Sequence, residues 1–252
     1  MIKLELSSYP KSGNTWFRHI VQDYFSILNK KEYYYPPDIH ESENNLNDYK
    51  AQNVKFINKD IFVYKSHVFN DPNQNPNKII HIFRHPLDVF LSSRMHLFNR
   101  SVFMSDRRKK SYFLNGIPKT VDDVIRDNEM DYYFDEFIED LGITYYNSIL
   151  GDKSNYFSYV LSALKSNLSV SIKYEDLVNK TNETTNFAFQ SYWPNIPSIK
   201  LNNSSINKKT KFSGDSFYWK SRAENFKHYL TAKQIKKFSM KYGNELSLIG
   251  YH

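Results

Sequence analysis

The sequence predicts an α/β fold in which helices flank a mostly parallel central sheet. Near-continuous apolar runs at 60–69 and 78–85 suit strands that are buried on both faces. Stretches with helical spacing alternate with these runs, and a glycine turn joins the first strand pattern to the first helix pattern. The chain of 252 residues is long enough for one full-sized core, so we expect a single domain over 1–252.

The first elements follow from local patterns. The segment IKLELSS at 2–8 predicts a short strand. A helix follows the turn, because Phe17, Ile20, Tyr24 and their apolar neighbours recur three and four residues apart. Residues 36–59 are polar and begin with two prolines, which favours a loop and makes this segment a candidate lid.

The second half of the chain contains further helix and strand patterns. Pro86 suits the first position of a helix that follows the third strand. Residues 120–166 are rich in aromatic side chains and predict helices, and 168–177 predicts a fourth strand. A closing helix is expected at 231–246, with Thr231 as its N-terminal cap.

The charge of the chain favours an anionic partner. Its formal net charge is +7 and its isoelectric point is about 9.2. The basic residues are spread along the chain, and the one dense cluster, DRRKK at 106–110, is typical of a solvated loop. A small polyanionic ligand accounts for this charge as well as nucleic acid does, and because the motifs below favour the small ligand, no nucleic-acid partner is expected.

Composition also indicates the compartment. No apolar run approaches the roughly 18 residues that a membrane-spanning helix requires. The N-terminus lacks the continuous apolar segment of a signal peptide, and the chain has no cysteine for disulfides or thiolate metal sites. We therefore expect a cytoplasmic protein without a membrane partner and without a metal.

The turn YPKSGNTW at 9–16 has the composition of a P-loop-like phosphate site between a strand and a helix. Gly13 lets the backbone approach a ligand, and Lys11 adds a mobile positive charge. The nucleoside-triphosphate pattern G-x-x-x-x-G-K-S/T is absent, because the lysine precedes the glycine. Taken alone, the turn fits a phosphate site and a plain strand-to-helix turn, capped by Ser12 or Thr15, equally well.

Further motifs follow in order along the chain, and together they resemble one family. YPKSGNTW resembles the 5′-phosphosulfate loop, close to YPKSGTTW, of the sulfotransferases that use 3′-phosphoadenosine-5′-phosphosulfate (PAPS). The resemblance extends through most of the chain. It implies that the turn binds the 5′-phosphosulfate through Lys11, Ser12, Gly13, Asn14, Thr15 and Trp16.

The segment YKSH is similar to the Lys-Ser/Thr-His of this family, in which the histidine is the general base. The resemblance assigns that role to His67, and a histidine pKa near 6.5 suits proton transfer at neutral pH. Lys65 and His67 project to the same side if both lie on a strand. Without the flanking motifs, a lone strand histidine is more often a packing residue.

The segment FRHPLDVFLSSR is similar to the family's 3′-phosphate motif, close to RNPxDVxxS. Arg84 matches the motif's arginine, which clamps a phosphate through two hydrogen bonds, and Ser92 matches its serine. Two positions differ from the motif. His85 replaces the usual asparagine, and Leu87 replaces the usual basic residue.

Two weaker matches complete the resemblance. The segment IKYEDL resembles the strand-end YEDL whose tyrosine lies near the adenine, which places Tyr174 there. The segment FYWKSRAENF stands where the family has an Arg-Lys-Gly loop followed by Gly-Asp-Trp-Lys-Asn. Either Lys220 or Arg222 then contacts the 3′-phosphate, with Phe226 at the aromatic position. The family's glycines are missing here, so both assignments stay open.

The resemblance implies a sulfuryl transfer from PAPS to a hydroxyl or amine of a small-molecule or sugar acceptor, which leaves 3′-phosphoadenosine-5′-phosphate (PAP). His67 accepts the proton, Lys11 stabilises charge on the bridging oxygen, and Lys65 orients the sulfuryl group. No metal takes part. Neither the acceptor nor the oligomeric state is indicated by the sequence.

Three alternatives remain open at this point. A P-loop kinase of similar size would bind ATP with magnesium. A nucleic-acid-binding protein would show affinity that falls steeply with salt. A sulfotransferase-like protein that has lost its activity would bind nucleotide without transferring a sulfuryl group.

Overall fold

A computed structural model describes residues 2–38, 54–56, 59–70, 75–141, 155–212 and 222–251. The chain divides into two compact units. The first is formed by Met1–Arg84 and Tyr159–Ser213, and the second by His85–Ser158 and Gly214–His252. The expected single domain over 1–252 remains a prediction, and each unit is described by itself.

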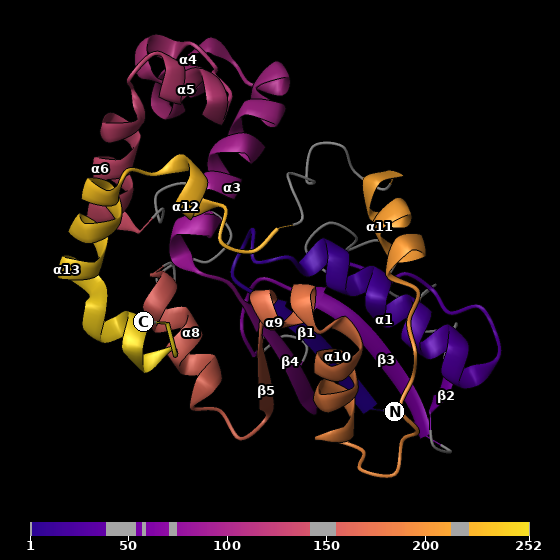
Figure 1. The fold of residues 1–252 in the computed structure, drawn as a ribbon. Helices are drawn as coiled ribbons and strands as arrows, with labels where there is room; N and C mark the ends of the chain where they lie inside the picture. Colours follow the sequence, from indigo (N-terminus) through magenta and orange to yellow (C-terminus); the bar gives the residue numbers. More distant parts are fainter. Residues whose placement is uncertain are drawn as a thin grey trace. The chain divides into compact units, whose positions relative to one another are not determined.

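A five-stranded sheet forms the centre of the first unit (Figure 1). Its strand order is β2-β3-β1-β4-β5, in which β2 is antiparallel to β3 and every other neighbouring pair is parallel. The sheet confirms the predicted α/β fold with a mostly parallel sheet. The strands are β1 (Ile2–Ser8), β2 (Val54–Phe56), β3 (Lys59–Ser66), β4 (Lys78–Phe83) and β5 (Ser169–Lys173).

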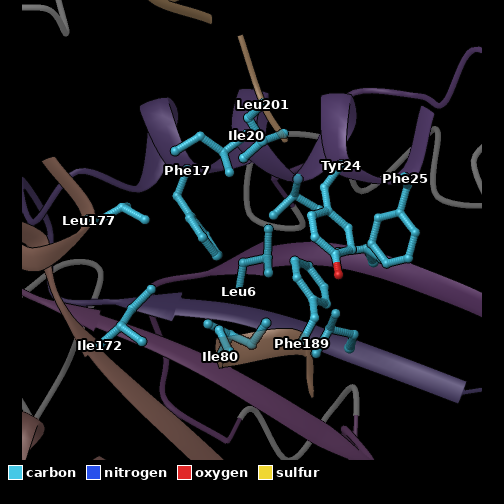
Figure 2. Packing of buried hydrophobic residues seen from close by; sticks show 14 of the residues in the cluster. Leu6, Phe17, Ile20, Tyr24, Phe25, Ile80, Ile172, Leu177, Phe189 and Leu201 are labelled. Atoms are coloured by element: carbon cyan, nitrogen blue, oxygen red, sulfur yellow. The ribbon is translucent and has the colours of Figure 1, made fainter. Parts of the chain in front are cut away.

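Helices of the first unit cover one face of this sheet, and the main hydrophobic core lies between them and the strands (Figure 2). Alternate strand residues such as Leu6 and Ile80 pack against Phe17 and Ile20 of α1. Tyr24 stacks on Phe189 with ring centroids 4.2 Å apart. The helices are α1 (Asn14–Asn29), α9 (Tyr174–Asn179), α10 (Thr181–Gln190) and α11 (Asn203–Phe212).

The opposite face of the sheet is buried and includes polar side chains among its apolar ones. Ser7 hydrogen-bonds Tyr159 of α8 (Tyr156–Leu164), with 2.9 Å between the two hydroxyl oxygens. His81 is fully buried, and its burial lowers the pKa of the imidazole to about 3. This face therefore contains a neutral histidine that packs among aromatic rings.

The described part of the second unit is helical. Helix α13 begins after Thr231, which is its N-terminal cap as predicted, and the Thr231 and Gln234 side chains form a reciprocal capping box. Lys237 of α13 pairs with Asp135 of α6 at 2.7 Å. The elements are α3 (Pro86–Arg100), η1 (Ser101–Phe103), α4 (Asp106–Tyr112), η2 (Leu114–Gly116), α5 (Val121–Arg126), α6 (Met130–Asp140), α12 (Phe226–Tyr229) and α13 (Ala232–Leu248). No helix in the described ranges is both long and apolar enough to cross a bilayer.

Several predicted strands end earlier than expected. The strand predicted at 60–69 ends at Ser66, so His67 lies just beyond it. The strand predicted at 78–85 ends at Phe83, because His85 caps α3 by accepting a hydrogen bond from Leu87 N–H.

The remaining corrections concern other elements. The strand predicted at 168–177 ends at Lys173, because the acidic residues after Tyr174 suit the first turn of α9. The basic cluster at 106–110 lies in a helix that Ser105 caps, rather than in a loop. Within the predicted loop 36–59, residues 54–56 form the edge strand β2. Residues 39–53 of this candidate lid lie outside the described residues.

Candidate active site at the carboxyl ends of the strands

The sequence-predicted residues of the first unit gather at one edge of the sheet. Strand β1 pairs with β3 on one side and with β4 on the other, so the chain connections diverge at its carboxyl end. Such a point is where open parallel sheets bind ligands. Four candidate groups follow the ends of these parallel strands, namely the 9–16 turn, the Lys65–His67 segment, Arg84 and Tyr174.

The turn between β1 and α1 exposes the beginning of the helix to a ligand. Gly13 is the N-cap, in the left-handed conformation with φ of 99°, and no side chain of the described residues caps the helix. The turn is closed by a hydrogen bond of 3.2 Å from Ser12 N–H to the carbonyl oxygen of Tyr9. The backbone N–H groups of the first helical turn are therefore available to an anion. Neither Ser12 nor Thr15 acts as the ordinary cap.

Polar atoms beside the turn are buried without a partner. Ser12 Oγ, Asn14 Oδ1 and Trp16 Nε1 have no hydrogen-bond partner within the described residues. The other amide atom of Asn14, Nδ2, donates to the Leu6 carbonyl oxygen at 3.1 Å and to Ser8 Oγ at 3.0 Å. Buried polar groups are normally satisfied, and the Ser12 hydroxyl and Trp16 N–H suit a ligand rich in acceptor oxygens.

Three cations converge at this edge. The pKa of Lys11 falls from 10.5 to about 7, first because the ammonium is desolvated and then because Lys65 and Arg84 repel its charge. Arg84 is 3% exposed and Lys65 is 7% exposed. A site with this excess of positive charge favours a polyanionic ligand.

Lys65 has a buried acidic partner that sequence reasoning missed. Its ammonium forms an ion pair with the Asp38 carboxylate, which is 4% exposed. In the sequence, Asp38 is an acidic residue that follows two prolines and lies 27 residues before Lys65. No local signal in the chain indicates this pairing.

His67 is oriented by the backbone of β1. Its Nδ1 lies 2.8 Å from the carbonyl oxygen of Ser8. A carbonyl oxygen only accepts hydrogen bonds, so Nδ1 carries the proton and the neutral ring has its lone pair on Nε2. The side chain is half-buried. This is the tautomer that a general base requires.

Arg84 follows β4 and Tyr174 follows β5, whereas His67 follows β3 on the other side of β1. The guanidinium carbon of Arg84 lies 4.4 Å from the centroid of the Tyr174 ring. The same ring contacts Trp16 edge-on, at a centroid distance of 6.1 Å. Tyr174 is thus a buried residue at the start of α9 that packs against both the turn and the arginine.

The other candidates belong to the second unit or are not described. Ser92 lies in α3 and is buried, whereas Arg222 is exposed. Lys220 lies outside the described residues. The grouping of Ser92, Arg222 and Lys220 with the turn remains a prediction.

The second unit also shows a structural role for Asp88, which follows Pro86 in the segment FRHPLDVFLSSR. Asp88 is buried in α3 and accepts a 2.9 Å hydrogen bond from the backbone N–H of Phe226. The His85 ring stacks on Phe226 at 4.2 Å, and Asn225 Nδ2 donates to the Arg222 carbonyl oxygen at 2.8 Å. The start of α3 thereby holds the segment that carries Arg222.

Fold and site together define an α/β protein with a glycine turn between its first strand and an uncapped helix N-terminus. The family described as "Sulfotransferase domain" matches residues 3–250, nearly the whole chain. The chain therefore belongs to the sulfotransferase domain family, which confirms the family expected from its motifs.

Individual relatives agree with this assignment. The human protein Sulfotransferase 6B1 is 28% identical over 185 residues, which are 67% of this chain and 52% of that protein. The chain thus spans about half the length of this curated relative. The mouse sulfotransferase SULT7A1, solved in complex with PAP, aligns with a TM-score of 0.59 at 15% identity, over 98% of this chain and 85% of the other. A retinol dehydratase, solved with retinol and PAP, aligns with a TM-score of 0.51 at 14% identity, over 97% and 81%. These structures confirm the fold.

Proposed function

We propose that this protein transfers the sulfuryl group of PAPS to a hydroxyl or amine of a small-molecule or sugar acceptor. The observation that carries this proposal is the convergence of Lys11, Lys65 and Arg84 on an uncapped helix N-terminus, beside His67. Family membership supports the reaction class. The PAP in both similar structures supports the donor, and the retinol in one of them supports a small-molecule acceptor.

The residues of the site fit this donor. The 5′-phosphosulfate would bind at Ser12–Trp16, where unpartnered donors and the helix N-terminus lie together. Arg84 would bind the 3′-phosphate with Ser92, and Tyr174 would lie beside the adenine. Lys220 or Arg222 would complete the 3′-phosphate site. In that position PAPS supplies an activated sulfuryl group.

The side chains then act through proton transfer and preorganised charge. His67 accepts the acceptor's proton at Nε2, and the Ser8 carbonyl oxygen stabilises the resulting imidazolium through Nδ1–H. The Lys11 ammonium stabilises negative charge that develops on the bridging oxygen, and Lys65 orients the sulfuryl oxygens. Lys65 is buried and Lys11 is half-buried, and this partial removal from water strengthens both interactions.

A thermal-shift titration tests the donor site. PAP is compared with ATP, with and without magnesium. A ligand present at a hundred times its dissociation constant adds about 2.7 kcal/mol to the free energy of unfolding. We expect PAP to stabilise the protein without metal. Stabilisation by ATP with magnesium alone would overturn the proposal in favour of a kinase.

A radiolabelled-transfer screen tests the reaction. PAPS labelled in its sulfuryl group is incubated with separate pools of alcohols, phenols, amines and sugars. We expect label to enter at least one pool in the presence of the wild-type protein. A protein that binds PAP but labels no pool would instead be a nucleotide-binding relative without activity.

A further inference from the structure

The buried carboxylate of Asp38 is paired with Lys65, one of the three cations of the site. We propose that Asp38 is a positioning residue that holds the Lys65 ammonium in the orientation needed at the sulfuryl group, a role that rests on the proposed function. The ion pair between the two side chains is buried on both sides. Asp38 touches Lys65 rather than the reacting atoms, and it acts through that lysine.

The backbone fixes the distance between Asp38 and Lys65. The two residues form a parallel bridge at the carboxyl end of β3. The backbone N–H of Lys65 donates to the Pro37 carbonyl oxygen at 2.8 Å. The carboxylate therefore reaches Lys65 from a neighbouring chain segment that is hydrogen-bonded to the same strand.

The segment that carries Asp38 is itself held firmly. The Tyr34 hydroxyl accepts from Val63 N–H at 2.9 Å and donates to the Val63 carbonyl oxygen at 3.2 Å. Arg18 Nε donates to the Pro36 carbonyl oxygen at 2.7 Å. These contacts fix the backbone that leads into Pro37, so Asp38 is preorganised before any ligand binds.

Charge gives the second reason for an acid at this position. A buried ammonium is costly unless an opposite charge accompanies it, and Arg84 and the protonated form of Lys11 add positive charge nearby. An ammonium has three N–H donors. Lys65 can therefore keep its bond to Asp38 and still donate to a sulfuryl oxygen, with its flexible side chain restricted to one orientation.

Asp38→Asn tests the proposal, because asparagine keeps the shape but not the charge. The acceptor is the one that gives the highest turnover in the transfer screen. We expect kcat to fall about 10- to 100-fold, as for other small misplacements of catalytic groups. The dissociation constant for PAP should stay equal or become lower, since the net positive charge of the site increases. Asp38→Glu restores the charge and should recover part of kcat.

Two further variants separate positioning from general stability. Asp60→Asn makes the same chemical change at an exposed carboxylate on β3, the strand that carries Lys65, and should keep wild-type kcat. In a Lys65→Met background, Asp38→Asn should cause no further loss of kcat, because its effect passes through the lysine.

The outcomes distinguish this role from the proposed function. An active wild type whose Asp38→Asn variant keeps full kcat would overturn the role of Asp38 alone. A variant that loses thermal stability, PAP affinity and kcat together, with no recovery in Asp38→Glu, would show a purely structural residue. A wild type that neither binds PAP nor transfers a sulfuryl group would overturn the function and this role with it.

Discussion

The ring of Tyr174 lies directly over Gly13. A Cβ atom built on the glycine would come within 2.4 Å of the ring Cδ2 atom and 2.5 Å of Cε2. The glycine also has a positive φ of 99°, a conformation that residues with a Cβ rarely adopt. The phosphate turn thus requires glycine for two independent reasons, its backbone conformation and the tyrosine packed on it.

Gly13→Ala should therefore destabilise the protein. Backbone strain and overlap with the ring together should lower the free energy of unfolding by about 2–5 kcal/mol. Urea denaturation without ligand measures this change. Gly243→Ala is the matched control, since its Cβ meets nothing within 4 Å, and it should leave stability unchanged or raise it by up to about 1 kcal/mol. Equal effects of the two variants would contradict the geometry of the turn.

His67→Asn should remove the base without removing the donor site. We expect kcat to fall by about 10²–10⁴-fold, the usual contribution of a general base. The affinity for PAP should stay near that of the wild type, because the ring acts on the acceptor. Steady-state kinetics and a PAP titration on the same preparation measure both quantities. Unchanged turnover would reject His67 as the base.

Lys11 should make PAP binding depend on pH. Its pKa in the ligand-free protein is about 7, whereas a bound anion favours the charged ammonium. Above pH 7 the free protein has lost this proton, so binding must take it up. The dissociation constant should therefore rise with pH, by up to about tenfold per unit between pH 7 and 9. The phosphates of PAP are already ionised in this range, since their second pKa is about 6.

Calorimetry in two buffers of different ionisation enthalpy measures the proton uptake directly. Lys11→Arg is the control, because a guanidinium stays charged throughout the range. Its affinity for PAP should be nearly independent of pH between 7 and 9. A wild type with the same flat profile would show that Lys11 is charged in the free protein.

Arg84 should recognise the 3′-phosphate specifically. Arg84→Lys keeps the charge but loses the planar fork that binds two oxygens and stacks on Tyr174. We expect affinity for PAP to weaken about 10- to 100-fold. Adenosine 5′-monophosphate lacks the 3′-phosphate, so its affinity should change little. An equal loss for both ligands would mean that Arg84 supports the fold of the site rather than one phosphate.

Much of the first unit could be predicted from local patterns. Apolar alternation in β1 places Leu4 and Leu6 in the core, and the glycine turn that follows predicts the helix. The same alternation says little about the residues of β1 that point to the opposite face of the sheet. Glu5 is fully buried there and accepts a hydrogen bond from Asn70 N–H at 3.1 Å. Asn70 and a second donor, the Tyr64 hydroxyl, are both distant in sequence, so a local pattern gives no sign of the buried acid.

Strand ends and Asp38 show a second limit of sequence patterns. Apolar content continues through Val68 and into Tyr174, but hydrogen bonding to neighbouring strands stops at Ser66 and Lys173. Where a strand ends is decided by its partners and by the helix that follows. Asp38 was missed for a related reason, because its pairing depends on a backbone bridge to β3 that forms only in the folded chain.

The order of the strands has a consequence for synthesis. Strand β1 is made first, yet both of its neighbours, β3 and β4, are encoded beyond residue 58. The emerging chain must therefore hold an apolar strand with two open edges until these partners leave the ribosome. Long-range parallel pairing of this kind slows folding and exposes the chain to aggregation. Recovery of protein from recombinant expression should accordingly improve at lower temperature, because the association of exposed apolar surfaces weakens on cooling.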